Sequence, residues 1–286
     1  MHILTYSRSF FALTLVAALA APSFLSAQSV LLSAGDFTLL GGSGITSTGV
    51  IGTQIGNGNV GLSPGPTTAI TGFPPAEIYN GAIIATGDVT GQARADLIKA
   101  STALALMPSD HKLSNQDLAG MTLAPGVYTF DGAANLNGVL TLDAQGQNGV
   151  YWVFQISTAL NTSVDSSISF ANFGSNNGSD IGLFWNAGTT IITGANNQLA
   201  GNFLSGTSIT FGAGSSGGGR ALALADITLD QNQLDAFGGP GGSDYTGGLQ
   251  YDLLGNIVAI PEPASAGLAF ALLAGLTALC RRNRRC

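Results

Sequence analysis

Charged residues, histidine and cysteine are scarce in this chain of 286 residues. Only 9% of its residues are charged, against roughly 25% in an ordinary soluble domain. The chain has 2 histidines and 2 cysteines, the latter at Cys280 and Cys286. So few of these residues make a metal cluster, a Ser-His-Asp triad or a disulfide framework an unfavourable interpretation. The 9 Lys and Arg against 16 Asp and Glu also exclude a basic surface for nucleic acid.

The N-terminal segment has the order of a secretory signal peptide. Arg8 precedes an apolar run from Phe10 to Ala21, and small residues follow up to Ala27. The apolar run is too short to span a membrane. The pattern predicts a signal peptide over residues 1–27, cleaved near Ala27, and hence an exported protein.

The C-terminal segment, residues 260–286, predicts a second sorting signal. An apolar stretch over residues 264–280 is just long enough to be a transmembrane segment, and a cluster of arginines follows it, as the positive-inside rule expects. A Pro-Glu-Pro motif precedes the stretch, at Pro261, Glu262 and Pro263. This order resembles the PEP-CTERM sorting tail of Gram-negative bacteria. The resemblance implies a transient membrane anchor, cut by a membrane sorting protease, and a secreted or cell-surface product; a plain membrane anchor is the alternative.

Between these two signals the chain is acidic and contains no cysteine. Residues 28–260 hold 4 basic and 15 acidic side chains, which gives a net charge of −11. Hydrophobic residues make up 45% of the whole chain, which is enough for a core. A domain of this kind must be stable without disulfides, which favours a repetitive, well-packed architecture.

Most of this region has the texture of short β-strands, with one helix. Runs of β-branched and aromatic residues alternate with Gly, Asn and Ser turns over residues 36–70 and 118–234. Between them, apolar residues at helical spacing predict a helix over about residues 88–107. The pattern is compatible with a sandwich, a barrel or a solenoid. Two similar units, 208–212 and 226–230, lie 18 residues apart, which favours the solenoid.

Several sequence blocks, in order, resemble the bacterial and fungal ice-binding proteins that have a discontinuous β-solenoid. These blocks occupy residues 61–65, 70–75, 123–128, 140–146, 152–156, 201–204, 219–223 and 227–230. The resemblance implies a mainly β fold: a right-handed parallel β-helix of triangular section, in which N-terminal strands close the stack out of sequence order and one long α-helix packs alongside. It places the solenoid domain at residues 28–235. Residues 236–259 are then a Gly-rich extension or linker. Arg220, a lone basic residue in this part of the sequence, is expected to be a structural hydrogen-bond donor at a corner of the coil.

The resemblance implies adsorption to ice through a flat Thr/Ser-rich face, giving thermal hysteresis and inhibition of ice recrystallisation. In a parallel β-helix, outward side chains form ranks at the strand spacing of about 4.7–4.9 Å. Alternation about inward apolar residues selects candidates for this face. They are Thr46, Thr48, Thr141, Asn161, Ser163, Thr190, Ile192, Ser208, Thr210 and Thr228. Three acids on or beside the same face, Asp143, Asp226 and Asp230, count against the assignment.

Two other functions compete with ice binding. Parallel β-helices also carry polysaccharide hydrolases and lyases, which need paired carboxylates in a cleft or acids with a basic partner. Asp226, Asp230 and Asp235 cluster in the sequence without a basic residue nearby, so we expect no enzyme, no cofactor and no bound metal. A non-enzymatic structural or adhesive protein of the cell surface or matrix is the alternative. The expected partners are an ice surface and the export and sorting machinery, not nucleic acid, and the expected state is a monomer.

Overall fold

The computed structural model describes residues 29–114 and 116–260. The signal peptide expected over residues 1–27 lies outside the described residues. So do the sorting motif at Pro261, Glu262 and Pro263 and the apolar segment 264–280.

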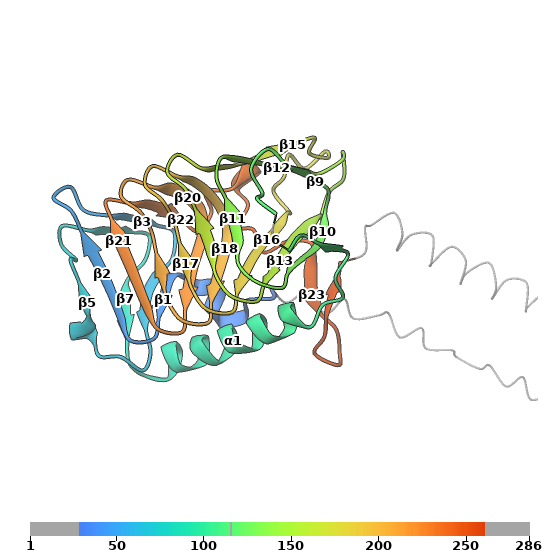
Figure 1. Ribbon diagram of the computed structural model, residues 1–286. Helices are drawn as coiled ribbons and strands as arrows, with labels where there is room; N and C mark the ends of the chain where they lie inside the picture. The colour runs from blue at the N-terminus through green and yellow to red at the C-terminus, as the bar shows by residue number, and fades with distance from the viewer. Residues whose placement is uncertain (1–28, 115, 261–286) are drawn as a thin grey trace, which may run out of the picture.

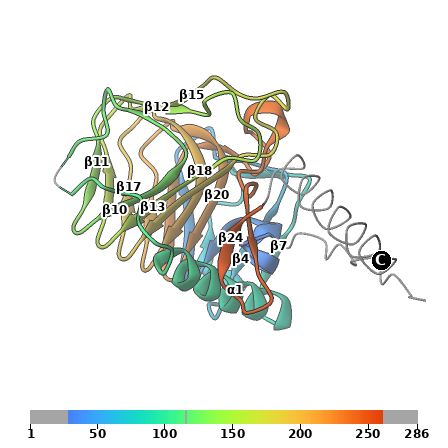
Figure 2. The ribbon, with the colours of Figure 1, turned by 90° about the vertical axis from the view of Figure 1, so that its right-hand side faces the viewer.

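The described chain winds into a parallel β-solenoid with three sides, whose cross-section is visible end-on (Figure 2). Successive strands pair in register around each side, which is the fold expected from the resemblance. Three short 3-10 helices, η1 (Leu32–Asp36), η2 (Thr67–Ala69) and η3 (Pro240–Gly242), lie outside the strands. A seven-stranded sheet forms one side, and a fifteen-stranded sheet wraps around the other two.

The first side of the large sheet faces a helix and is called the helix side. Its strands, in spatial order, are β8 (His111–Lys112), β10 (Gly126–Phe130), β13 (Tyr151–Ile156), β16 (Gly182–Ala187), the second halves of β18 (Gln198–Ser205) and β20 (Ser216–Ala223), β1 (Phe37–Gly41), β4 (Asn59–Leu62) and β7 (Ile83–Ala85).

The second side of the large sheet is called the glutamine side, after residues described below. Its strands, in spatial order, are β9 (Thr122–Leu123), β12 (Val139–Asp143), β15 (Ser167–Ala171), the first halves of β18 and β20, β22 (Gln233–Asp235), β3 (Gln54–Gly56) and β6 (Glu77–Tyr79).

The seven-stranded sheet is the third side. Its strands, in spatial order, are β11 (Ala134–Leu136), β14 (Leu160–Thr162), β17 (Ile191–Ile192), β19 (Ile209–Thr210), β21 (Asp226–Asp230), β2 (Gly44–Thr48) and β5 (Ile70–Thr71). This sheet faces the viewer in Figure 1.

The coil order is discontinuous, as the resemblance implies. Strands β1, β2 and β3 stack directly on β20, β21 and β22, so the beginning of the solenoid pairs with its end. Strands β4, β5 and β6 form the next layer on the three sides, and β7 lies beyond β4 on the helix side. N-terminal residues therefore complete each of the three sides at one end of the stack (Figure 1).

Helix α1 (Asp88–Ala105) returns the chain along the solenoid to β8, and its bounds confirm the predicted helix. Its buried residues Ala93, Leu97, Ala100 and Leu104 pack with outward apolar residues of the helix side, such as Phe184, in a second hydrophobic core. Within residues 29–114 and 116–260, no helix is both long and apolar enough to cross a membrane.

The main core runs inside the solenoid as a stack of aromatic rings. Tyr128, Phe154, Trp185 and Phe203 are register partners on neighbouring strands. Their successive ring centroids are 5.5, 4.0 and 6.2 Å apart, with nearly parallel planes. The stack fixes the coil register, because a shift by one residue would turn these rings outward.

Strands β18 and β20 each turn the corner between the glutamine side and the helix side at a glycine. Gly201 in β18 and Gly219 in β20 have φ values of +104° and +115°. A Cβ atom on Gly219 would lie 2.0 Å from the carbonyl oxygen of Gly201 in the coil below. Only glycine allows both the backbone conformation and this close approach.

The Gly-rich residues 236–259 pack against the solenoid, so they are an extension of the domain and the linker interpretation is wrong. Ser243, Tyr245 and Leu249 are buried, and β23 (Leu249–Tyr251) forms an antiparallel hairpin with β24 (Ile257–Ala259). The glycines permit tight turns and close backbone contacts here. One of them, Gly247, donates its N–H to the carbonyl of Ile181 at 3.1 Å.

Arg220 fastens this extension to the coil, in the structural role expected from the sequence. Its side chain is 3% exposed and forms an ion pair of 3.2 Å with Asp244. It also donates to the carbonyl oxygens of Asp244 and Gly35, each at 2.8 Å, and to Asn202 Oδ1 at 3.2 Å. One buried guanidinium therefore joins the extension, the N-terminal segment and strand β18.

Candidate functional site

The seven-stranded sheet carries one continuous row of outward side chains, here called the threonine rank. Each member is the register partner of the next across the sheet. In spatial order the threonine rank is Asn135, Asn161, Ile192, Thr210, Thr228, Thr46 and Thr71. Its last four members are all threonines, and they come from parts of the chain far apart in sequence.

The rank is held in place by the aliphatic residues that precede it. Ile209, Ile227 and Ile45 are buried in the core, each directly before a threonine of the rank. Since side chains alternate along a strand, an inward isoleucine forces the next residue outward. β-Branched threonines also have a restricted χ1, so their hydroxyl and methyl groups keep fixed directions.

The hydroxyl groups of the rank lie at the protein surface with few protein partners. Thr71 Oγ1 donates to Thr46 Oγ1 at 3.2 Å, and Asn161 Nδ2 donates to Asn135 Oδ1 at 3.4 Å. Among the residues that the structure describes, no side-chain hydrogen bond is formed by Thr210. The hydroxyl groups without a protein partner are therefore available to hydrogen-bond with water.

The structure brings together nine of the ten candidate residues. Thr46, Asn161, Ile192, Thr210 and Thr228 are members of the threonine rank. The other four point outward from the same sheet or its immediate margin, two residues from a rank member along their strand. These are Thr48, Ser163, Thr190 and Ser208.

Thr141 is the exception, and its placement on this face is wrong. It lies in β12 on the glutamine side, where its Oγ1 and Ser169 Oγ are 3.1 Å apart. Alternation correctly made Leu142 inward and Thr141 outward, but it cannot tell which side of the solenoid a strand belongs to. Asp143 lies in the same strand as Thr141, so it is on the glutamine side and not on the sheet that carries the threonine rank.

Two members of the rank, Asn135 and Thr71, escaped the sequence analysis. The signal for Thr71 was present, because Ile70-Thr71 repeats the Ile-Thr pair found at 45–46, 209–210 and 227–228. Its position beside a Pro-rich turn concealed it. Asn135 has no such signal, since Ala134 rather than isoleucine precedes it.

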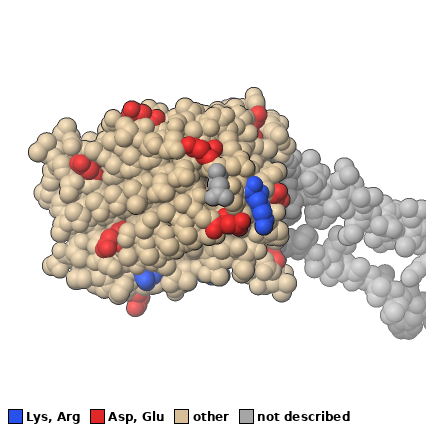
Figure 3. Space-filling view, viewed as in Figure 1, with Lys and Arg blue, Asp and Glu red and all other residues tan. Residues whose placement is uncertain are grey.

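The rank itself is uncharged, and two acids flank it. Asp226 is exposed two residues before Thr228, and Asp230 is half-buried two residues after it. Uncharged surface fills most of this side, and the acidic side chains on it lie apart from one another (Figure 3). In residues 29–114 and 116–260, no three His, Cys, Asp or Glu side chains gather as metal ligands would.

Fold and site together define a parallel β-solenoid that presents an uncharged row of side chains, four of them adjacent threonines. Residues 39–235 match the family model described as ice-binding-like, and the chain belongs to this family. An ice-binding protein of Nostoc sp. (strain HG1) is 39% identical over 208 residues, covering 72% of this chain and 73% of that protein.

Solved structures agree with this assignment. The ice-binding protein of the Antarctic ascomycete Antarctomyces psychrotrophicus has a TM-score of 0.65 at 33% identity, covering 72% of this chain and 97% of that one. A domain of the Shewanella frigidimarina ice-binding protein has a TM-score of 0.66, covering 73% of this chain and 97% of that one. At 24% identity, the latter supports the fold alone.

Proposed function

We propose that this protein binds ice through the threonine rank. The observation that carries the proposal is the run of four threonines, Thr210, Thr228, Thr46 and Thr71, on adjacent strands of one sheet, in a row that contains no charged side chain. Relatives of the same family are named ice-binding proteins.

The rank suits a crystalline water surface for geometric reasons. Parallel strands repeat at about 4.7–4.9 Å, so the threonines present hydroxyl and methyl groups at regular intervals. A hydroxyl can hold a water molecule in a lattice position, while the neighbouring methyl group favours ordered water beside it. Each contact is weak, and affinity comes from many contacts made at once by a rigid face that loses little entropy on binding.

Adsorption of this kind gives two effects on ice. Protein fixed to the surface pins the advancing ice front, which lowers the freezing point below the melting point. It also slows the growth of large crystals from small ones. We infer that the protein acts in this way outside the cell, as a non-enzymatic monomer, after export directed by residues 1–27 and sorting through residues 260–286.

The direct test holds a single ice crystal just below its melting point in a solution of the purified protein. We expect a gap between melting and freezing temperatures, a faceted crystal, and slower recrystallisation of polycrystalline ice. Round crystals without a gap, together with unhindered recrystallisation by folded protein, would refute the function. The solenoid would then be better explained as a structural or adhesive scaffold.

A further inference from the structure

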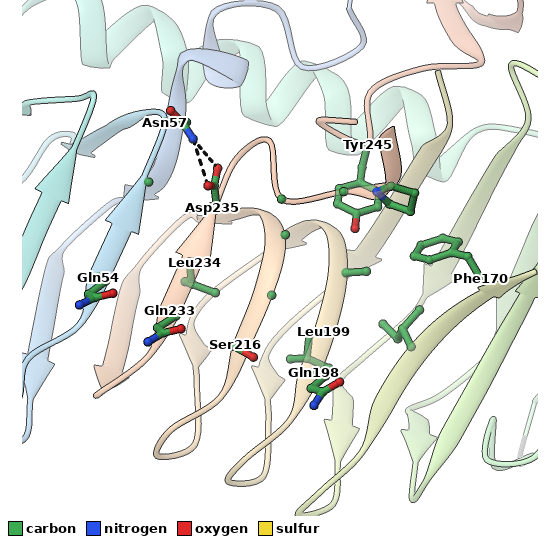
Figure 4. Close-up of a pocket in the computed structure, with 18 of the residues that line it drawn as sticks. Gln54, Asn57, Phe170, Gln198, Leu199, Ser216, Gln233, Leu234, Asp235 and Tyr245 are labelled. Carbon is green, nitrogen blue, oxygen red and sulfur yellow. Dashed lines mark hydrogen bonds between the residues drawn. The ribbon is translucent and has the colours of Figure 1, made fainter. Parts of the chain in front are cut away.

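The glutamine side carries a second row of outward residues with different chemistry. Its members, in spatial order, include Gln198, Ser216, Gln233, Gln54 and Glu77. The surface here is hollowed into a groove of about 800 Å³ that crosses strands β15, β18, β20, β22 and β3. The side chains along this groove are shown in Figure 4.

Three amide groups in the groove are available to a ligand. Gln54, Gln198 and Gln233 are exposed, and their side chains form no hydrogen bond with any residue in the part of the chain that the structure describes. Each primary amide offers both donors and an acceptor. They recur on neighbouring or next-neighbouring strands, so the hydrogen-bonding groups run along the solenoid axis.

Tyr245 in the extension forms one wall of the groove and adds a hydroxyl group to its lining. The residue is 3% exposed, and its ring stacks with that of Phe170 at 6.0 Å. Its hydroxyl points into the groove (Figure 4) and has no hydrogen-bond partner among residues 29–114 and 116–260. Burial raises the pKa of Tyr245 above its usual value, so the hydroxyl stays a neutral donor. Since this hydroxyl is not among the buried unpaired atoms of the described residues, it is accessible from the groove and free to donate to a ligand there.

The charge of the lining restricts what this partner can be. No Lys, Arg or His lines the groove among the described residues. The carboxylate of Asp235 already accepts two hydrogen bonds from Asn57 Nδ2, at 2.9 and 3.0 Å. An anionic ligand would thus meet acidic groups without a compensating cation, and a cation would meet only a carboxylate that is engaged elsewhere.

We propose that the groove binds a neutral, extended polysaccharide. Hydroxyl-rich sugars need groups that both donate and accept, which the amides, Ser216 and Tyr245 provide. Their apolar ring faces need an aromatic wall, which the half-buried ring of Phe170 provides at the edge of the groove. The strand spacing of about 4.8 Å is close to the length of one sugar unit in an extended chain, so successive units would meet successive strands.

This groove is not a second ice-binding face. Its amides sit on long, rotatable side chains, and its surface is concave, so it lacks the flat rigid lattice of the threonine rank. The extension that supplies Tyr245 begins where the family match ends, at residue 235. The groove is therefore built partly from a segment beyond the residues that the family model matches, and the inference does not depend on ice binding.

Isothermal titration calorimetry of the purified protein with cellohexaose, xylohexaose and laminarihexaose tests the proposal. Oligogalacturonate serves as the anionic counterpart. We expect saturable binding of at least one neutral oligosaccharide and none of the anionic one. A Gln198→Ala/Gln233→Ala double variant should bind roughly tenfold more weakly, because it loses two hydrogen bonds. Tyr245→Phe should weaken binding about fivefold while keeping the ring.

Controls separate this site from the threonine rank. The glutamine and tyrosine variants should retain the circular dichroism and the ice activity of the wild type, and Thr210→Tyr should retain oligosaccharide binding. Absence of binding to all three neutral probes overturns the proposal. So does binding that the folded glutamine and tyrosine variants leave unchanged.

Discussion

Ile192 interrupts the threonine rank between Asn161 and Thr210. Its side chain is 49% exposed, so an apolar surface stands where the neighbouring strands present hydroxyl groups. Replacing it with threonine keeps the β-branched shape that suits a strand. The site illustrates how one residue can limit a surface whose affinity depends on regular repetition.

We predict that Ile192→Thr increases thermal hysteresis by extending the run of threonines from four strands to five. The free energy of unfolding should change by less than about 0.5 kcal/mol, because the site is a surface position. Nanolitre osmometry at equal protein concentration measures the effect. Val139→Thr is the matched control, since Val139 is also 49% exposed but lies on the glutamine side. Equal gains from both variants, or a loss in Ile192→Thr alone, would contradict the assignment of the rank.

Much of the site could be predicted at the scale of single residues, and the limit of this prediction has a physical cause. Alternation about Ile45, Ile209 and Ile227 assigns the inward and outward residues correctly, because a strand has only two faces. A triangular coil has three sides, however, and local alternation is the same on each. Thr141 was therefore assigned outward correctly but to the wrong side.

Among the larger elements, the extension over residues 236–259 is joined to the coil by the buried guanidinium of Arg220. Arg220 pairs with Asp244, and it also donates to Gly35 and Asn202. Burial lowers the pKa of Arg220, while Asp244 opposes this shift by favouring the charged form. These contacts offset the cost of burying the guanidinium charge. Removal of the guanidinium would leave several buried acceptors without a donor.

We expect Arg220→Met to reduce the free energy of unfolding by about 3 kcal/mol. The variant leaves buried hydrogen-bond acceptors without a donor and the Asp244 carboxylate without its ion-pair partner. Asp244→Asn should cost less, because an amide oxygen still accepts from the guanidinium. Urea unfolding followed by the fluorescence of the buried Trp152 and Trp185 gives both values. An Arg220→Met midpoint equal to that of the wild type would show that the extension is not held in this way.

The elements also show where sequence patterns mislead. The helix at Asp88–Ala105 was predictable, because its apolar spacing and the following Pro108 are local signals. The packing of residues 236–259 was not. Their glycine content is typical of a linker, but it serves close backbone approach to the coil. That use of glycine depends on contacts with Ile181 and Gly218, which are distant in sequence.

At the scale of the whole molecule, buried tyrosines make the fold sensitive to high pH. Burial, together with the nearby Asp110 carboxylate, raises the pKa of Tyr128 from 10.0 to about 12. Burial also raises the pKa of Tyr251 to about 12, with a further contribution from Asp96. Their hydroxyls donate to the carbonyl oxygens of Ala124 and Val30.

We predict that the free energy of unfolding falls as the pH rises from about 10 to about 12. A raised pKa stabilises the folded state fully below the unfolded value near 10, and this contribution is lost as the pH rises through the folded value. Tyrosinate absorbance and circular dichroism, recorded together in an alkaline titration, should change in the same interval. Complete tyrosine ionisation near pH 10 with intact circular dichroism would contradict the burial of these side chains.

The three sides of the solenoid carry different surfaces. One side is closed by α1, one carries the threonine rank, and the third carries the glutamine groove. All three depend on the same aromatic core, so a destabilising variant would affect every property at once. Only a comparison between folded variants on different sides can assign a function to one of them.

The most direct test of ice binding through the threonine rank is therefore a matched pair of bulky substitutions. Thr228→Tyr places a large ring in the middle of the rank, and Ser216→Tyr places the same ring on the glutamine side. Thermal hysteresis is measured for both, after circular dichroism has shown that each variant is folded. We predict that Thr228→Tyr loses most of the activity and Ser216→Tyr keeps it. Full activity in Thr228→Tyr, or an equal loss in both variants, would contradict the account.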